Sequence, residues 1–490
     1  MINLQKQILR YILLSGLVVL ISFTLYIAWS MNVEGLGFPI DDAWIHQTYG
    51  RNFGKNLQWS FSLDTPSGGS TGPAWGILIG IMYLLGIPPI LGTFFLGYLF
   101  LWGSAVAAIL IFNKFGFTEK VSGLIAGSLI GLEWHIVWAA LSGMETIVIM
   151  FLVLLLFYWF FTKKENWWFP GILIGLSVWI RPDGITLLGP ALFILYFREY
   201  TNKIKIRKLL SILGSFILIF GLYILFNWMV AGDIWPNTFY AKQAEYAVLR
   251  ENGFGYRYFN VSLQFFIGVG VLLFPGMILE ALRIVQKKEW DKAAAIIWVL
   301  GYIGLYAWRL PVTYQHGRYI MPAMPLGFLI GLAGMMRWTG LKEKAYWQRV
   351  ISRVWIGSAI IVATVFWIMG ARTYARDVAV IETEMVQTSQ WVMANTNKSD
   401  VLAAHDIGAL GYFSNRKILD LAGLITPDVI PFIRNEDRLR KYLDQNNVDY
   451  LMTFPDWYPG LINGLELAYK SNGKYAPEFG SSNMTIYYWK

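Results

Sequence analysis

Residues 11–42 read YILLSGLVVLISFTLYIAWSMNVEGLGFPIDD, a long apolar run followed by a pair of aspartates. The run at 11–29 follows Arg10 and is long enough to cross a hydrocarbon core of about 30 Å. It is also longer than most secretory h-regions, so we interpret it as a retained anchor. The chain of 490 residues is 56% hydrophobic and only 14% charged. This composition predicts a mainly α-helical, polytopic membrane protein.

The positions of Lys and Arg predict how the spans are oriented. Basic residues such as Arg10, Lys114, Arg207 and Arg337 gather in alternate loops, which predicts a cytoplasmic N-terminus. The first outer loop then covers 30–88, and its apolar stretch at 74–87 is predicted to be a juxtamembrane helix because it is short for a span. About eleven spans are predicted, near residues 11–29, 89–112, 121–141, 145–162, 168–181, 184–197, 209–231, 260–282, 293–308, 319–336 and 352–370.

The composition changes after residue 370. We therefore predict a transmembrane catalytic domain at 1–370 and a small extracytoplasmic domain at 371–490. Helical and alternating patterns succeed one another in this tail, which predicts an α/β fold. The expected helices lie at 374–396 and around 427–446, and the expected strands lie at 401–405, 417–421, 448–454 and 484–489.

Several classes of site are disfavoured by composition. The chain has no cysteine, and its four histidines are scattered, so a zinc cluster is not expected. The net charge of +9 is explained by cations at the cytoplasmic ends of spans, and no nucleic-acid partner is predicted.

The pair Asp41-Asp42 is the most informative feature of the first outer loop. Residues 42–53 have a helical pattern, with an apolar face formed by Trp44, Ile45, Tyr49 and Phe53 that is expected to lie in the membrane interface. Asp41 is therefore a candidate N-cap of this helix. Two acids in a row exceed what one cap needs, and the helix dipole favours an ionised carboxylate that can accept a proton. Both interpretations stay open from the sequence.

The other outer loops add polar residues in the same compartment. Glu145 stands at the mouth of a span, where an acid is costly unless it meets water, a cation or a substrate. Arg181 and Asp183 flank a Pro/Gly turn and are candidates for a structural ion pair. The later loops contribute further candidates for substrate binding: Asn237, Tyr240, Lys242, His316 and Arg318.

Seven motifs stand in the outer loops and the tail: Asp41-Asp42-Ala43-Trp44-Ile45, Ser142-Gly143-Met144-Glu145-Thr146, Arg181-Pro182-Asp183-Gly184, Pro236–Lys242, Gly317-Arg318-Tyr319, Asp406–Gly411 and Asp420–Leu424. In order and placement, these motifs resemble the GT-C superfamily of integral-membrane glycosyltransferases, and most of all the mycobacterial terminal arabinofuranosyltransferases. The first outer loop of that group carries a Glu-Gly-(aromatic)-Thr motif, where this chain reads Gly68-Gly69-Ser70-Thr71-Gly72-Pro73. The sugar therefore stays open.

The resemblance implies an inverting transfer of a sugar from a polyprenyl-phosphate donor at the outer face of the inner cell membrane. The acceptor is a hydroxyl of a glycan, glycolipid or protein, and Asp41 or Asp42 is its general base. Arg318, Lys242 and Arg181, in that order, are expected to meet the leaving phosphate. His316, Glu145, Asp183, Tyr240 and Asn237 are the further substrate-binding candidates. No cofactor is expected, although Asp41, Asp42 and Glu145 also offer oxygens for a divalent metal, as some GT-C members require.

Two other functions remain open at this point. A transporter or flippase for lipid-linked sugars would use the same cations, but acids, prolines or glycines that interrupt spans near the midplane would then be expected. A binding protein would use the C-terminal domain as a glycan receptor. In that domain, Asp406 and Asp420 either end strands near an acceptor cleft or are ordinary turn residues.

Overall fold

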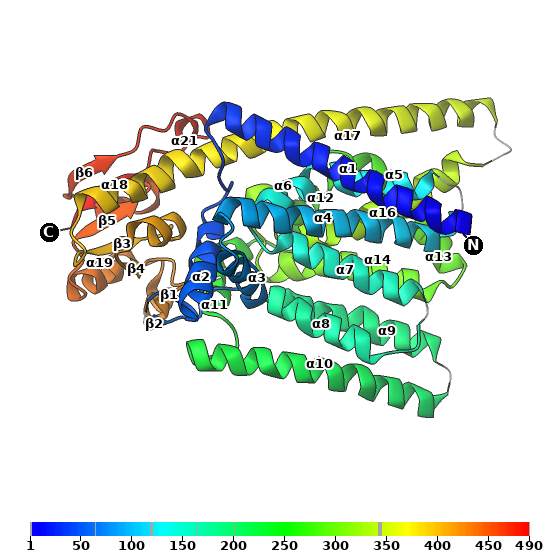
Figure 1. Ribbon diagram of the computed structural model, residues 1–490, viewed down its shortest axis with the longest axis horizontal. Coiled ribbons are helices and arrows are strands. Elements are labelled where there is room, and N and C mark those ends of the chain that lie inside the picture. Colours follow the sequence, from blue (N-terminus) through cyan, green and yellow to red (C-terminus); the bar gives the residue numbers. More distant parts are fainter. Residues whose placement is uncertain are drawn as a thin grey trace.

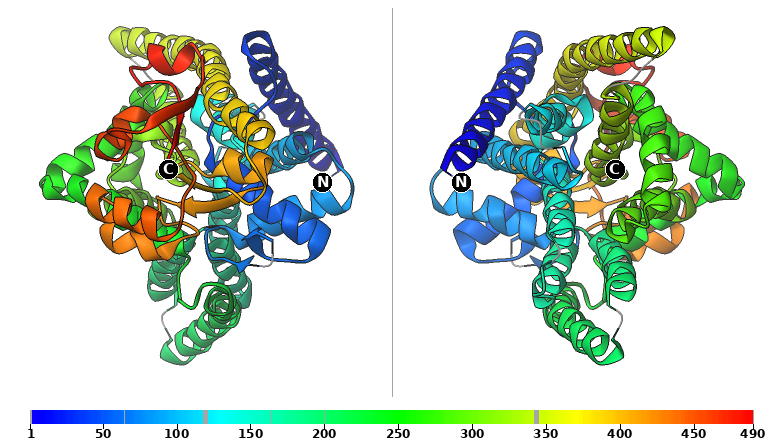
Figure 2. Two further views of the ribbon diagram at one scale, coloured as in Figure 1. Left: turned by 90° about the vertical axis from the view of Figure 1, so that its left-hand side faces the viewer. Right: turned by 90° about the vertical axis from the view of Figure 1, so that its right-hand side faces the viewer.

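The computed structural model describes residues 2–63, 65–117, 121–162, 164–199, 201–341 and 345–489. For residues 2–8 it describes the backbone. The molecule is elongated, with most helices running roughly along its long axis (Figure 1). The N-terminus lies at one end, and the C-terminal domain covers the other (Figures 1 and 2). The N-terminus and the C-terminal domain therefore lie at opposite ends of the helical bundle, as the predicted topology requires. Which end faces the cytoplasm stays a prediction.

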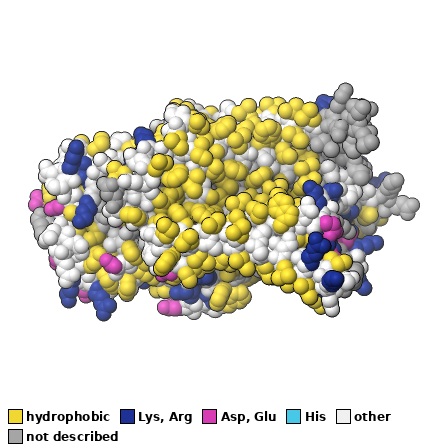
Figure 3. Space-filling model, turned by 60° about the horizontal axis from the view of Figure 1, so that its bottom comes forward, with side chains coloured by type: hydrophobic (Ala, Val, Ile, Leu, Met, Phe, Trp, Pro, Cys, Tyr) yellow, Lys and Arg dark blue, Asp and Glu magenta, His cyan; other side chains and the backbone are white. Residues whose placement is uncertain are grey.

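The helical part is an apolar bundle with charged ends. Figure 3 shows hydrophobic side chains across the middle of the visible face, with Lys, Arg, Asp and Glu gathered towards the two ends. The bundle is formed by α1 (Ile2–Val33), α4 (Pro89–Lys114), α5 (Ser122–Leu132), α6 (Trp134–Leu141), α7 (Thr146–Phe161), α8 (Trp168–Ile180), α9 (Leu188–Arg198), α10 (Asn202–Ala231), α12 (Phe254–Phe266), α13 (Gly270–Gln286), α14 (Trp290–Arg309), α16 (Met324–Thr339) and α17 (Tyr346–Val380).

Fewer helices are long enough to span a membrane than the sequence predicted. Among the described residues, five helices have the length and hydropathy of a span, or seven if each of two bent pairs is one span. The apolar helices α7 and α8 are shorter than a typical span. The segment predicted at 184–197 begins with a 3-10 turn, Pro182–Leu187, before α9. The protein is thus a helical membrane protein, and its count of eleven spans stays a prediction.

Two of the predicted spans are broken helices. The segment 121–141 bends by 55° between α5 and α6, where the carboxylate of Glu133 accepts the backbone N–H of Ile136 and starts a new helix. The segment 260–282 bends by 109° between α12 and α13, where Gly268 has a φ of +99°. Trp134 donates its indole N–H to the carbonyl of Ile267 at 3.1 Å. The two breaks therefore contact each other, and the freed backbone is satisfied inside the protein.

The first outer loop folds into two helices that pack closely. They are α2 (Asp42–Asn56) and α3 (Pro73–Leu84), joined by a hairpin of β1 (Ser60–Ser62) and β2 (Thr65–Pro66). Each helix carries two glycines four residues apart, a spacing that lets helix backbones approach. A Cβ on Gly54 would lie 2.4 Å from the carbonyl oxygen of Gly80. Helix α3 is the segment that was predicted as a juxtamembrane helix.

Helix α2 is not an interfacial helix. Trp44, Ile45 and Tyr49 are at most 5% exposed, because the helix is covered by α3 and by residues of the C-terminal domain. Its apolar face therefore belongs to the protein core, and the interfacial position expected from the sequence was wrong.

The C-terminal domain is built on a mixed five-stranded sheet. The strand order is β4-β3-β5-β7-β6, with β4, β3 and β5 parallel and the last two strands antiparallel. The described elements of the domain and of the segment leading into it are α18 (Gln387–Asn395), β3 (Val401–Ala404), β4 (Lys417–Asp420), α19 (Glu436–Gln445), β5 (Tyr450–Thr453), α20 (Pro459–Ile462), β6 (Glu466–Lys470), α21 (Tyr475–Glu478) and β7 (Thr485–Tyr488). The four strands expected from the sequence are present, and β6 is additional.

The sheet is buried on both faces, which fixes its position against the helices. Leu402 and Ala404 join the core that continues into the helical part, whereas Ala403 packs with Leu439 and Leu443 of α19. The helix α17 also runs without interruption past residue 370, so the boundary predicted there falls inside a helix. The two parts share one hydrophobic core.

The close approach of α2 and α3 predicts a specific sensitivity. Gly54→Ala places a methyl group against the backbone of α3, and we expect a loss of about 1–3 kcal/mol in unfolding free energy. Gly214→Ala is the matched control, because nothing lies within 4 Å of its Cβ position in α10. Thermal unfolding of the purified protein in detergent measures both. A Gly54→Ala melting temperature equal to that of wild type would contradict the close packing.

Candidate functional site

The two adjacent aspartates at the start of α2 have different surroundings. The Asp41 side chain makes no capping hydrogen bond to α2. It accepts the backbone N–H groups of Gly408 and Ala409, at 2.6 and 2.8 Å, from the turn that follows β3. Gly408 is required there, because a Cβ would lie 2.0 Å from the carbonyl oxygen of Asp41. The interpretation of Asp41 as a helix cap was therefore wrong, and its carboxyl group holds the C-terminal domain.

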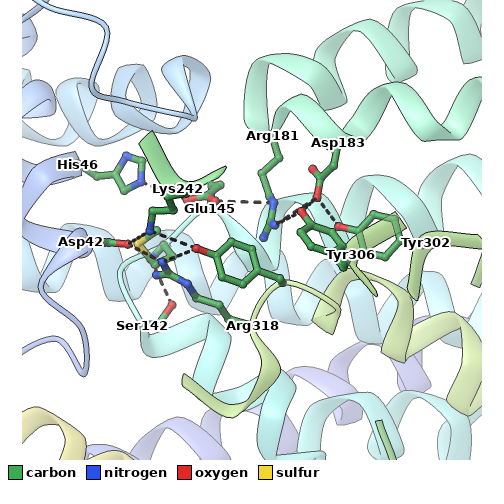
Figure 4. A network of polar contacts seen from close by, with 12 residues as sticks. Asp42, His46, Ser142, Glu145, Arg181, Asp183, Lys242, Tyr302, Tyr306 and Arg318 are labelled. Atoms are coloured by element: carbon green, nitrogen blue, oxygen red, sulfur yellow. Dashed lines mark hydrogen bonds and ion pairs between the residues drawn. The ribbon is translucent and has the colours of Figure 1, made fainter. Parts of the chain in front are cut away.

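Asp42 instead meets two cations. Its Oδ2 accepts hydrogen bonds from Arg318 Nη2 at 2.5 Å and from Lys242 Nζ at 3.3 Å (Figure 4). The same two groups also donate to the hydroxyl of Tyr319, at 3.2 and 3.1 Å. Lys242 comes from α11 (Asn237–Glu245), and Arg318 directly follows the short turn α15 (Tyr314–Gly317).

The surroundings also give the carboxyl groups of Asp41 and Asp42 different pKa values. Burial opposes ionisation of Asp42, but the charges of Lys242 and Arg318 outweigh it and hold the pKa of Asp42 well below its usual range. Burial and the nearby carboxyl group of Asp406 raise the pKa of Asp41 to about 8, against the two N–H donors that favour its charged form. Asp42 is therefore the member of the pair that is ionised at neutral pH.

The cluster around Asp42 has one more cation than anion. Side chains of Lys242 and Arg318 are only 17% and 5% exposed, and the single Asp42 Oδ2 serves both. The Nη1 atom of Arg318 is buried and donates to no acceptor among the described residues. A buried guanidinium with an unused donor is costly unless an anion completes it. Lys242 and Arg318 therefore have capacity for a further acceptor.

A second polar network lies beside the first (Figure 4). Glu145 pairs with His46 at 3.2 Å and approaches Arg181 at 3.9 Å. Arg181 is also 3.2 Å from Asp183. The latter receives hydrogen bonds from the hydroxyls of Tyr302, at 2.5 Å, and Tyr306. Arg181 and Asp183 thus form an ion pair, and Arg181 is balanced by two carboxylates.

Two cavities meet at Asp42. The first, called here the helix cavity, has a volume of about 260 Å³ and is bounded by Asp42, Glu145, Arg181, Phe239, Lys242 and Arg318 together with apolar side chains of the helices. The second, the domain cavity, has a volume of about 680 Å³ and lies against the C-terminal domain, bounded by Asp42, Lys242, Glu245, Arg318, His405 and Asp406 among others. Asp42, Lys242 and Arg318 line both.

Six of the residues singled out from the sequence line the helix cavity: Asp42, Glu145, Arg181, Asp183, Lys242 and Arg318. Four others do not. Asp41 binds the C-terminal domain, and His316 is 2.8 Å from Asp377 and packs against Trp134 and Trp138. Tyr240 donates to Asp233 at 2.7 Å, and Asn237 is buried with its backbone N–H on the carbonyl of Gly68. His316, Tyr240 and Asn237 therefore line neither cavity, and their roles in substrate binding stay predictions.

Other residues of the site were not selected from the sequence. His46 lies one helical turn after Asp42, and this i, i+4 spacing was a signal that placed it on the same face. Tyr319 and His405 reach the site through tertiary packing, which no local pattern reveals. Asp406, for which the sequence left a position near a cleft open, lines the domain cavity. Within the described ranges, no group of three His, Asp or Glu side chains has the arrangement of a metal site.

The comparisons with known proteins concern the fold of the chain. The family model described as "Domain of unknown function (DUF8728)" matches residues 374–487. No curated protein is significantly similar in sequence. Among solved structures, the apo oligosaccharyltransferase of Archaeoglobus fulgidus is similar with a TM-score of 0.61 and 12% identity, over 92% of this chain and 70% of that chain.

Two further structures are similar over almost the whole chain. ArnT from Cupriavidus metallidurans has a TM-score of 0.58 and 12% identity over 97% of both chains, and it has also been solved with undecaprenyl phosphate bound. Mycobacterial arabinofuranosyltransferase AftD has a TM-score of 0.54 and 14% identity, over 96% of this chain and 41% of that chain. These likenesses confirm the GT-C fold expected from the sequence.

The contact of Asp41 with the C-terminal domain leads to a prediction. Asp41→Ala leaves two buried N–H groups without an acceptor, and we expect the free energy of unfolding to fall by about 2 kcal/mol or more. Thermal unfolding and hydrogen exchange at residues 407–411 measure the effect, and exchange there is expected to become faster. Asp428→Ala, at an exposed carboxylate of the same domain, is the control. Unchanged exchange in Asp41→Ala would show that this contact does not hold the domain.

Proposed function

We propose that this chain, a protein of the GT-C fold, is a glycosyltransferase that moves a sugar from a polyprenyl-phosphate donor to an acceptor hydroxyl. The observation that carries the proposal is the unused, buried donor of Arg318 beside Lys242, at the point where the two cavities meet. A phosphate supplies the anion that this pair lacks, and Arg binds phosphate oxygens through two parallel N–H groups.

The helix cavity suits the lipid-linked donor. Its lining combines charged groups with apolar side chains such as Ile185, Trp235 and Phe239, so a polyprenyl chain and its phosphate find matching surfaces. Burial of the lipid contributes about 0.8 kcal/mol for each methylene removed from water. The structure of ArnT with undecaprenyl phosphate supports this class of ligand for the fold.

In the proposed reaction, the acceptor enters from the domain cavity and its hydroxyl oxygen attacks the anomeric carbon of the donor. The bond from that carbon to the phosphate oxygen breaks, and its electron pair stays on the phosphate. The hydroxyl proton passes to the carboxylate of Asp42. Lys242 and Arg318 stabilise the charge that develops on the phosphate. Attack from the side opposite the leaving group inverts the anomeric configuration.

Asp42 becomes a better base when the donor is bound. In the structure its charge is stabilised by Lys242 and Arg318, which makes it a weak base. A donor phosphate competes for the same two cations and adds a negative charge nearby. Both effects raise the proton affinity of Asp42. Donor binding therefore prepares the base for the acceptor.

The first test is turnover of a panel of polyprenyl-phosphate sugars by the purified protein, with release of polyprenyl phosphate as the signal. Asp42→Asn is expected to lower kcat by about 10²–10⁴, the usual contribution of a general base. Asp233→Asn, at an exposed carboxylate outside both cavities, is expected to match wild type. Full activity in Asp42→Asn would exclude Asp42 as the base, and no turnover by wild type would favour transport or binding.

The phosphate site has its own test, which does not need a correct sugar. Arg318→Met removes the unused donor, and binding of undecaprenyl phosphate is expected to weaken by about 10- to 100-fold, since hydrogen bonds to charged groups are worth about 1.5–3 kcal/mol. Arg250→Met, at an exposed arginine, is the control. Binding is measured by native mass spectrometry in lipid nanodiscs. Equal binding by the two variants would contradict the assignment of Arg318.

A further inference from the structure

The C-terminal domain forms one wall of the domain cavity. His405 and Asp406 directly follow β3, and Trp457 and Tyr458 follow β5. Because β3 and β5 are parallel neighbours, their carboxyl ends lie at the same edge of the sheet. Four side chains of the domain therefore face the cavity that ends at Asp42.

Asp406 has free hydrogen-bonding capacity in this wall. Its Oδ2 is buried and accepts no hydrogen bond from the described residues. Burial of its carboxyl group raises the pKa of Asp406 to about 6. Asp420, at the end of the neighbouring strand β4, differs, because its two oxygens accept the N–H groups of Ala422 and Ile425 at 2.8 and 2.9 Å. Asp420 is a turn residue, whereas Asp406 has an oxygen available for a ligand.

The rest of the wall is held in place. His405 Nε2 is 3.3 Å from Glu245 Oε1, and its Nδ1 is 2.7 Å from the hydroxyl of Tyr458. Glu245 ends the helix α11, one turn after Lys242. The ring of Trp457 packs edge-on at 4.9 Å from His405 and is 45% exposed. This edge of the sheet thus presents an open aromatic ring and a carboxylate oxygen without a hydrogen-bond partner to the same cavity.

This combination of groups fits a carbohydrate. The ring face of a sugar covers an exposed aromatic ring, and its hydroxyls donate to carboxylates. Beyond the Asp42 cluster, the charged groups of the cavity are the acids Glu245, Asp406 and Glu436 and the bases His405 and Arg434. An anionic ligand would meet more carboxylates than cations there. A neutral, hydroxyl-rich ligand does not carry that penalty.

We propose that the C-terminal domain forms the acceptor subsite of the enzyme, that the acceptor is a neutral carbohydrate, and that Asp406 and Trp457 position its attacking hydroxyl towards Asp42. This inference rests on the proposed glycosyl transfer and assigns a role to the C-terminal domain. Asp406 acts as a positioning residue, because the base in the reaction is Asp42.

The subsite is tested first by binding, without any donor. Saturation-transfer NMR on the full chain in nanodiscs uses neutral methyl glycosides and their short oligomers as probes. We expect at least one of them to bind, and Trp457→Ala and Asp406→Asn each to weaken that binding about tenfold or more. Trp457→Phe, which keeps an aromatic ring, is expected to retain most of it. Phe479→Ala and Asp428→Asn, exposed positions of the same domain outside the cavity, are the controls.

A kinetic measurement then separates this inference from the proposed function. With the donor that wild type consumes, Asp406→Asn is expected to raise the KM for the carbohydrate acceptor about tenfold or more. The slow transfer to water and the binding of undecaprenyl phosphate are expected to stay at wild-type levels. If Asp406→Asn lost acceptor use, transfer to water and undecaprenyl-phosphate binding together, Asp406 would have a structural role. Its assignment to the acceptor would then be overturned.

Two other outcomes also overturn the inference. If wild type releases polyprenyl phosphate but binds no neutral glycoside, or binds one equally well with Trp457→Ala, the glycosyl transfer stands and the carbohydrate subsite fails. If glycosides bind in the cavity but no donor is ever consumed, the proposed function fails and the acceptor role fails with it.

Discussion

The hydrogen bonds from Gly408 and Ala409 to the carboxyl group of Asp41 hold the C-terminal domain on the first outer loop. Neighbouring side chains on a helix point about 100° apart, so fixing Asp41 towards the domain turns Asp42 towards the cavities. The contact also needs a glycine at 408, which ties the sequence of the domain to that of the loop. This local contact thus ties the domain to the first outer loop and leaves Asp42, not Asp41, facing the two cavities.

The sequence was sufficient to predict the regular helices and strands, but it did not reveal where helices are broken. Long apolar runs identified α1, α4 and α10 because backbone groups in hydrocarbon leave few alternatives to a helix. The bends at Glu133 and Gly268 were missed because a hydropathy average over many residues hides a single residue that caps or reverses a helix. The strand β6 was missed because it lies at a sheet edge and is largely exposed, so it lacks an apolar alternation.

The sequence predicted that the site residues share one side of the membrane, but it did not predict their contacts. Asp42, Lys242 and Arg318 are distant in sequence, and their common side of the membrane followed from the positions of the spans. The ion pairs among them depend on how α2, α11 and the turn at 314–317 pack, which spacing does not encode. His316 shows the same limit, because it lies two residues from Arg318 and yet faces Asp377. The turn has positive φ at Gln315 and His316, so adjacent side chains diverge there.

Charge balance explains why the two buried arginines are not equivalent. Arg181 lies between Glu145 and Asp183, and the hydroxyl of Tyr306 accepts a further hydrogen bond, so its charge is already neutralised. A phosphate that approached it would have to displace carboxylates. Arg318 shares one carboxylate with Lys242 and keeps an unused N–H, so an added anion lowers the electrostatic energy there. In the proposed reaction, this surplus positive charge would favour a phosphate at the junction of the two cavities, next to Asp42, the carboxylate of that cluster and the proposed base.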